Sequence, residues 1–150
     1  MEAKEVLPPD ANWLTPYLTV ADAERSLAFY ERAFGFTRGN VLPGPDGGIM
    51  HADMTYQGKS IIMFAPESAP SPKPMRTPAH SGIELPLSFY VYCPDVDAQA
   101  EQARRAEATI LSEPQDMFWG DRMMTLRDPD GYIWSFATRV GEFDPSKMPK

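Results

Sequence analysis

The chain repeats one order of secondary structure, and this repeat restricts its fold more than any other feature. Each half predicts a strand, a helix and three further strands. The segments of the first half are 13–20, 21–35, 36–42, 49–56 and 59–65. Those of the second half are 87–93, 94–108, 109–112, 120–127 and 132–139. The fold class is therefore α+β, with two βαβββ modules in tandem.

Local signals support this reading of the first module. Ala23, Leu27, Tyr30 and Phe34 follow steps of four, three and four, which predicts one apolar helical stripe. Asp22 is a suitable N-cap for this helix, and Gly35 is a suitable residue just after its end. Pro16 cannot donate a ladder hydrogen bond, so the strand that contains it is expected at a sheet edge or to begin there.

A proline-rich segment, 66–86, separates the modules. It holds six of the sixteen prolines and predicts an extended linker, because proline is excluded from central strands and helix interiors. We therefore expect one domain over 1–150, with modules at 13–65 and 87–139 and a tail at 140–150. One helix covers only one face of a four-stranded sheet. The mixed sheets are expected to curve around a groove between them, a usual place for a small ligand.

Charge and composition exclude several classes of function. The net charge of −7 would repel a phosphate backbone, so we expect no nucleic-acid partner. No apolar run reaches the ~18 residues of a membrane span, and the first ten residues lack the apolar core of a secretory signal. We expect a cytoplasmic protein without a membrane partner. Cys93 is the single cysteine, which excludes an intrachain disulfide and favours a small buried residue.

Four segments resemble the vicinal oxygen chelate superfamily of glyoxalase I, bleomycin-binding proteins and dioxygenases. They are TPYLTVADAERSLAFYERAFGF, MHADMTYQGKSIIMF, FYVYCPDVDAQAEQA and FWGDRMMTLRDPDGYIWSFAT. The resemblance implies a glyoxalase-like fold and a homodimer. It also places the family's metal-ligand positions on Thr15, Asp53, Ser88 and Ser135. Because hydroxyls are poor ligands for a transition metal, we expect a metal-depleted member with no tightly bound metal and no cofactor.

His51 and Asp53 lie two residues apart on a predicted strand and so share one face. Three roles are open to this pair: a polar wall of a binding site, an acid/base pair in catalysis, or part of a weak metal site. The other histidine, His80, lies in the proline-rich segment, where we expect it to be solvated.

Further candidates flank these positions. Tyr17 shares a face with Thr15, and Tyr90 and Tyr92 share one with Ser88, so these rings line the groove or fill core. At the start of the last hairpin, Arg122 either clamps an anionic ligand or, with Asp121, fixes its own loop. The predicted ligand-binding residues are Thr15, Tyr17, His51, Asp53, Ser88, Tyr90, Trp119, Arg122 and Ser135.

The leading functional hypothesis is the binding of a small organic molecule in the groove. The alternatives are a lyase or isomerase that uses His51 and Asp53, and an interaction module that has no ligand. No P-loop, Rossmann glycine fingerprint or GxSxG motif indicates another enzyme class.

Overall fold

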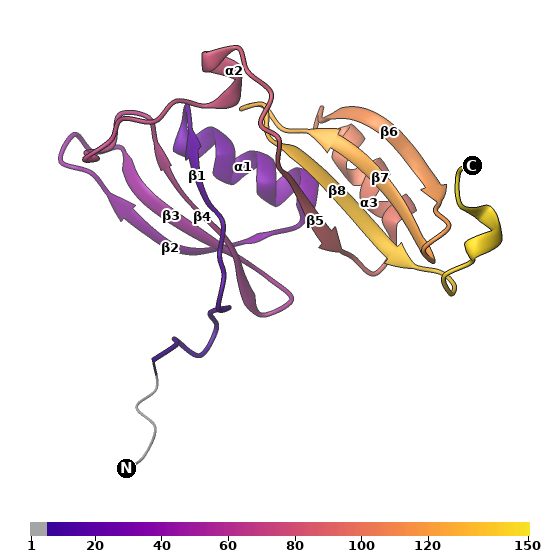
Figure 1. The fold of residues 1–150 in the computed structure, drawn as a ribbon. Helices are drawn as coiled ribbons and strands as arrows, with labels where there is room; N and C mark the ends of the chain where they lie inside the picture. The colour runs from indigo at the N-terminus through magenta and orange to yellow at the C-terminus, as the bar shows by residue number, and fades with distance from the viewer. Residues whose placement is uncertain (1–5) are drawn as a thin grey trace. The chain divides into compact units, whose positions relative to one another are not determined.

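Two four-stranded mixed sheets, each made by one βαβββ repeat, form the core of the computed structural model, which describes residues 6–150. The predicted tandem fold is confirmed. The first repeat comprises β1 (Tyr17–Val20), α1 (Ala23–Phe34), β2 (Thr37–Pro43), β3 (Ile49–Tyr56) and β4 (Lys59–Pro66). The second comprises β5 (Ser88–Tyr92), α3 (Val96–Arg105), β6 (Thr109–Asp116), β7 (Asp121–Arg127) and β8 (Ile133–Arg139). Figure 1 shows both repeats along the chain.

The two sheets have the same topology. Their orders are β1-β4-β3-β2 and β5-β8-β7-β6, and the first strand of each pairs in parallel with the last while the other pairs are antiparallel. Contacts between residues divide the chain into two units at Thr77 and Pro78, within the proline-rich segment. The last turn of α1, Arg32–Phe34, belongs by its contacts to the second unit.

Local chemistry sets where both helices begin and where α1 ends, whereas α3 ends at Arg105, three residues before the predicted end. The Asp22 side chain accepts a hydrogen bond from the Arg25 N–H at 3.0 Å and caps α1. Gly35 closes the helix with a φ of 72°, a left-handed conformation that favours glycine. Asp95 caps α3 in the same way, through the Ala98 N–H at 3.1 Å. Each of these caps therefore fixes the residue at which a helix begins or ends.

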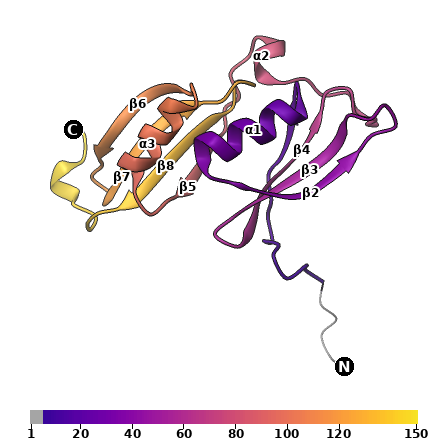
Figure 2. The same ribbon diagram turned by 180° about the vertical axis from the view of Figure 1, so that it is seen from behind.

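In the first unit, α1 covers one face of the sheet (Figure 2). Tyr30 of α1 packs edge-on against Phe64 of β4, with ring centroids 5.9 Å apart. The residues buried on that face of the strands are Leu18, Val20, Ala52, Met54, Ile62 and Phe64. Residues that alternate with them, including His51 and Asp53, lie on the opposite face, which we call the open face of the first sheet.

The second unit repeats this arrangement with α3 over its sheet (Figure 2). The buried strand residues on the helix side include Val91, Met124, Leu126, Trp134 and Phe136. Phe34 adds its ring to this core, with centroids 5.0 Å from Trp134 and 4.7 Å from Phe136. Cys93 is buried, and burial raises the pKa of its thiol, so it is a core residue rather than an activated nucleophile.

Three predicted segments that contain or follow proline differ clearly from the structure. β1 begins at Tyr17 rather than at residue 13, after Pro16. β6 continues to Asp116 instead of ending at residue 112, because an edge strand with an irregular register accommodates Pro114. The segment 66–86 is not extended throughout: α2 (Pro78–Ser81) forms one turn, with Pro78 at its first position, where a missing N–H costs little.

No helix within residues 6–150 is long and apolar enough to cross a membrane.

Candidate functional site

A row of polar side chains crosses the open face of the first sheet. The Tyr17 hydroxyl lies 2.9 Å from His51 Nδ1, and His51 Nε2 lies 4.0 Å from Asp53 Oδ2. The first distance is a hydrogen bond, whereas the second is too long for one and becomes an ion pair only when His51 is protonated. When the tyrosine hydroxyl donates to Nδ1, the proton of the neutral imidazole lies on Nε2, the nitrogen 4.0 Å from Asp53 Oδ2.

An irregularity in β2 holds the carboxylate of Asp53. The pairing of β2 with β3 shifts register between Arg38 and Val41. The Asn40 backbone N–H therefore donates to Asp53 Oδ1 at 2.8 Å, and the Asn40 side-chain amide donates to Oδ2 at 3.2 Å. A Cβ on Gly39 would lie 2.0 Å from Asp53 Oδ1, so only glycine permits this approach. The bulge thus aims and stabilises the Asp53 carboxylate.

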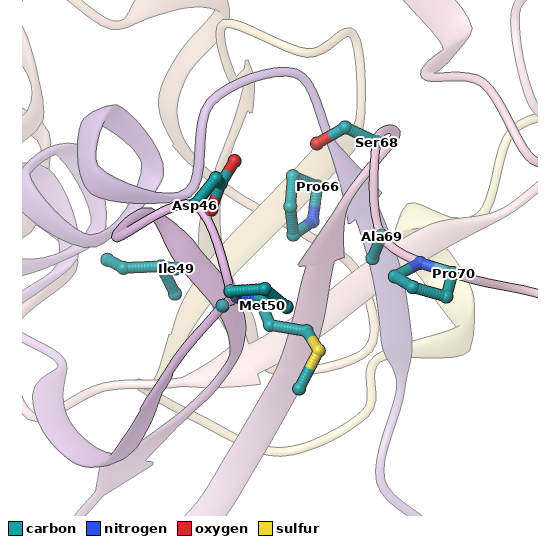
Figure 3. A pocket seen from close by; sticks show the side chains of 9 residues that line it. Asp46, Ile49, Met50, Pro66, Ser68, Ala69 and Pro70 are labelled. Carbon is teal, nitrogen blue, oxygen red and sulfur yellow. The ribbon is translucent and has the colours of Figure 1, made fainter.

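A hollow of about 230 Å³ lies beside Tyr17. It is bounded by β1, the end of β4 and the first part of the proline-rich segment; its lining includes Tyr17, Thr19, Ala65, Ala69, Pro70 and Met75. A second hollow of about 240 Å³ shares Pro66, Ala69 and Pro70 with it and reaches Asp46, Ile49 and Met50 (Figure 3). Both hollows are mainly apolar, so the row of Tyr17, His51 and Asp53 begins at the wall of an apolar recess.

The open face of the second sheet carries a different cluster, centred on Asp121. This residue is 5 % exposed, and its Oδ2 accepts hydrogen bonds from the hydroxyls of Tyr90 at 2.7 Å and Tyr92 at 2.9 Å. The Trp119 indole N–H donates to the Tyr90 oxygen at 3.1 Å. The carboxylate thus fixes two tyrosine rings from a strand that is not its neighbour in the sheet.

The hydroxyls of this cluster resist ionisation. The pKa of Tyr90 is raised to about 12, first by burial and also by the hydrogen bond to Asp121, while the hydrogen bond from Trp119 acts in the opposite direction. The pKa of Tyr92 is raised first by its hydrogen bond to Asp121. A hollow of about 500 Å³ lies beside the cluster and is lined by Tyr92, Trp119, Asp121, Arg139, Glu142 and Phe143. At neutral pH both tyrosines are hydrogen-bond donors.

The remaining predicted ligand-binding residues are placed less favourably. Thr15 lies before β1, outside the sheet, and Ser88 is exposed at the start of β5. Ser135 is buried, and its hydroxyl lies 3.1 Å from that of Thr125. Ser88 and Ser135 belong to the second unit, and within the described part of the first unit Thr15 makes no hydrogen bond to His51 or Asp53.

Arg122 has a structural role. Its guanidinium binds Asp97 of α3 at 3.0 Å and Asp116 of β6 at 3.1 Å. Alternation along β7 places it on the helix side of the sheet, opposite Asp121. The possibility that Arg122 clamps an anionic ligand therefore receives no support, because both carboxylates already use its donors.

Comparison with known proteins identifies the family. The sequence model of the glyoxalase/bleomycin resistance protein/dioxygenase superfamily matches residues 11–136. The chain belongs to this superfamily. An uncharacterised protein of Mycobacterium bovis is 33% identical over 135 residues, which cover 90% of this chain and 88% of that protein. An uncharacterised protein of Mycobacterium tuberculosis is also 33% identical, over 90% of this chain and 79% of its own length.

Solved structures of similar proteins have the same fold. TioX from Micromonospora sp. ML1 is 25% identical, with a TM-score of 0.67 over 86% of this chain and 99% of its own. A glyoxalase/bleomycin resistance protein/dioxygenase family enzyme from Burkholderia phytofirmans PsJN is 17% identical, with a TM-score of 0.64 over 87% of this chain and 98% of its own. The second likeness shows the fold alone.

The metal site that the superfamily fold implies does not fit the residues of this chain. Within residues 6–150, no group of three or more histidine, cysteine or acidic side chains is arranged to hold a metal ion. His51 and Asp53 are neighbours, but the Asp53 carboxylate is already bonded to Asn40. Ser135 offers a neutral hydroxyl, a weak donor for a divalent transition metal.

Sequence reasoning missed several residues that build these sites. Gly39 and Asn40 lie in β2, where the one available signal was a glycine that interrupts a strand, a common mark of a bulge. Glu142 and Phe143 lie in the segment predicted to be a tail, yet they line the hollow beside Asp121. Nothing local in the sequence distinguishes these two residues from ordinary surface positions.

Proposed function

We propose that this member of the superfamily binds a small organic molecule on the open face of its first sheet. The observation that carries the proposal is the row of Tyr17, His51 and Asp53, which starts at a mainly apolar hollow of about 230 Å³. Ligand sites combine an apolar lining with a few placed polar groups, and this recess has both. The hollow would hold the apolar body of the ligand, while Tyr17 and His51 would orient its polar end.

Binding in this proposal does not depend on a transition metal. Asp53 is held by Asn40 and is directed at His51, and the other family ligand positions carry the hydroxyl residues Thr15, Ser88 and Ser135. Elemental analysis of protein purified without chelators tests this part. Stoichiometric nickel, zinc, iron or manganese that resists dialysis, and that is lost in Asp53→Ala, would overturn it.

One observation favours a second candidate, a lyase or isomerase that uses acid/base chemistry. His51 lies between a tyrosine hydroxyl at 2.9 Å and a carboxylate at 4.0 Å. A histidine whose ring nitrogens face a hydroxyl and a carboxylate can pass protons to and from a bound ligand. The same row therefore serves either a polar binding wall or a proton-transfer site.

A matched pair of histidine variants separates the two candidates. His51→Gln keeps hydrogen bonding but removes the titrating ring, and His80→Gln makes the same change in α2, outside the row. For a ligand found by native mass spectrometry of the purified protein, a binding role predicts that His51→Gln weakens affinity by roughly 1 kcal/mol. A catalytic role predicts that turnover of that ligand falls by about a hundredfold or more.

His80→Gln should leave both quantities unchanged. The proposal is wrong if His51→Gln and Tyr17→Phe both bind the ligand as tightly as the unaltered chain and any turnover is unchanged. A ligand that binds elsewhere would then remain to be located by chemical-shift mapping.

A further inference from the structure

The Asp121 carboxylate lacks a cationic partner. It is 5 % exposed, and both tyrosine hydroxyls donate to the same oxygen, Oδ2. Among residues 6–150, no hydrogen-bond donor reaches Oδ1, and no lysine, arginine or histidine nitrogen lies within 4.0 Å of the carboxylate. Buried charges are normally paired, because an unpaired one loses most of its hydration. The cluster therefore leaves a place for positive charge.

The hollow beside Asp121 suits an organic cation. Of its lining residues, Tyr92, Trp119 and Phe143 are aromatic, and such rings attract cations through their faces. The charged lining consists of Asp121, Glu142 and Arg139, and the guanidinium of Arg139 is bound to Glu142 at 2.8 Å. Arg139 stands opposite Asp121 in the pairing of β7 with β8, but its guanidinium bonds Glu142 and not Asp121. The lining therefore carries two carboxylates against one guanidinium. An anionic ligand would meet a lining with more carboxylates than guanidinium groups, and both tyrosine hydroxyls already donate to Asp121.

The rings are also held in place before a ligand arrives. Tyr90 and Tyr92 pack edge-on with centroids 5.6 Å apart, and Trp119 packs against Phe118 at 4.9 Å with the planes at 87°. The indole N–H of Trp119 is bound to Tyr90. A site whose side chains are fixed in advance loses less conformational entropy when it binds.

We propose that this hollow in the second unit binds the substituted ammonium group of a small organic cation. The ammonium lies against Asp121 Oδ1, and its carbon substituents contact the rings of Tyr92 and Trp119. This inference goes beyond the proposed function, because it assigns a second binding site, in the second unit, and the chemical class of the ligand that this site takes.

A pair of probes that differ in charge but hardly in shape tests whether the ligand is an organic cation. Choline carries a quaternary ammonium, and 3,3-dimethylbutan-1-ol replaces its nitrogen by carbon at nearly the same shape. Binding to the full chain is followed by protein chemical shifts, which also serve for the variant without Trp119. We expect choline to bind at least tenfold more tightly than the alcohol, and its affinity to fall as salt is raised.

Two variants test whether choline binds at the Asp121 cluster. Asp121→Asn removes the charge while keeping the shape, and Trp119→Leu removes a ring that is 38% exposed, so the second change spares the core. Each should weaken choline binding about tenfold or more. The matched control is Asp97→Asn, which removes an exposed carboxylate bound to Arg122 on the helix side of the same sheet. This control should bind choline like the unaltered chain.

The two proposals fail in different ways. Equal binding of choline and the alcohol, or choline binding that survives both Asp121→Asn and Trp119→Leu, would overturn the cation site. If a neutral or anionic ligand binds and His51→Gln weakens it, while choline does not bind, the proposed function stands and the cation site is wrong. If no small molecule binds at all, both are wrong.

Discussion

Removing the Asp128 carboxylate should destabilise the protein strongly. Asp128 begins the turn between β7 and β8 and is 3% exposed. Its Oδ1 accepts hydrogen bonds from the backbone N–H groups of Asp130 and Tyr132, both at 3.0 Å. Its Oδ2 accepts one from the indole N–H of Trp134, also at 3.0 Å. One carboxylate thus closes the turn and anchors the buried Trp134, which is 1% exposed.

The magnitude follows from these contacts. A hydrogen bond to a charged group contributes about 1.5–3 kcal/mol, and each buried donor left without a partner costs about 1–3 kcal/mol. Because the bonds share one acceptor group, their contributions are not additive, and we expect Asp128→Ala to lower the free energy of unfolding by about 4 kcal/mol. With a urea slope of about 2 kcal/mol per molar, the unfolding midpoint should fall by about 2 M.

Urea unfolding followed by circular dichroism measures this effect, with Asp46→Ala as the matched control. Asp46 also accepts a hydrogen bond from the N–H two residues on, Gly48 at 2.9 Å, but it is exposed and anchors no tryptophan. Asp46→Ala should cost about 1 kcal/mol or less. If Asp128→Ala costs no more than Asp46→Ala, the Asp128 network does not stabilise the turn as argued.

Three further predictions concern pH, packing and assembly. The pKa of Tyr90 is raised from 10.0 to about 12, first by burial. The contribution of Tyr90 to stability is therefore complete below pH 10 and is lost as the pH rises towards 12. In Tyr90→Phe, the free energy of unfolding measured against pH should fall less between pH 10 and pH 12. Gly39→Ala should lower the free energy of unfolding by about 1–3 kcal/mol, because its Cβ would meet the Asp53 carboxylate at 2.0 Å, whereas Gly141→Ala meets nothing and should change little. Each sheet has one face without a helix of its own unit, so we expect a homodimer; sedimentation at micromolar concentration that gives only the 16.8 kDa of one chain would contradict this.

Much of the fold could be predicted because its signals are local. The caps at Asp22 and Gly35, the apolar stripe of α1 and the alternation along β3 each depend on residues a few positions apart. The turn between β3 and β4 is another such signal: Gln57 and Gly58 both adopt positive φ, as a tight hairpin requires. The strand bounds failed beside Pro16 and Pro114, where sheet position rather than the local sequence decides whether a missing N–H can be tolerated.

The candidate sites also combine features that local sequence predicts with features that depend on strand pairing. Alternation alone places His51 and Asp53 on one face, since side chains two apart on a strand point the same way. That Tyr17 reaches His51 depends on β1 and β3 lying on either side of β4, a pairing between segments far apart in the chain. The role of Asn40 depends on a register shift in β2, which no pattern along the strand reveals.

The sequence by itself determined the order of the elements, the repeat and the face on which most strand residues lie, because these follow from the periods of helix and strand. Only the tertiary structure decided which polar groups meet. Asp121 binds Tyr90 and Tyr92 across β8, and Arg122, its neighbour in sequence, binds Asp97 on the opposite face. A side chain's partner is set by strand order and register, and both arise from pairing over long sequence separations.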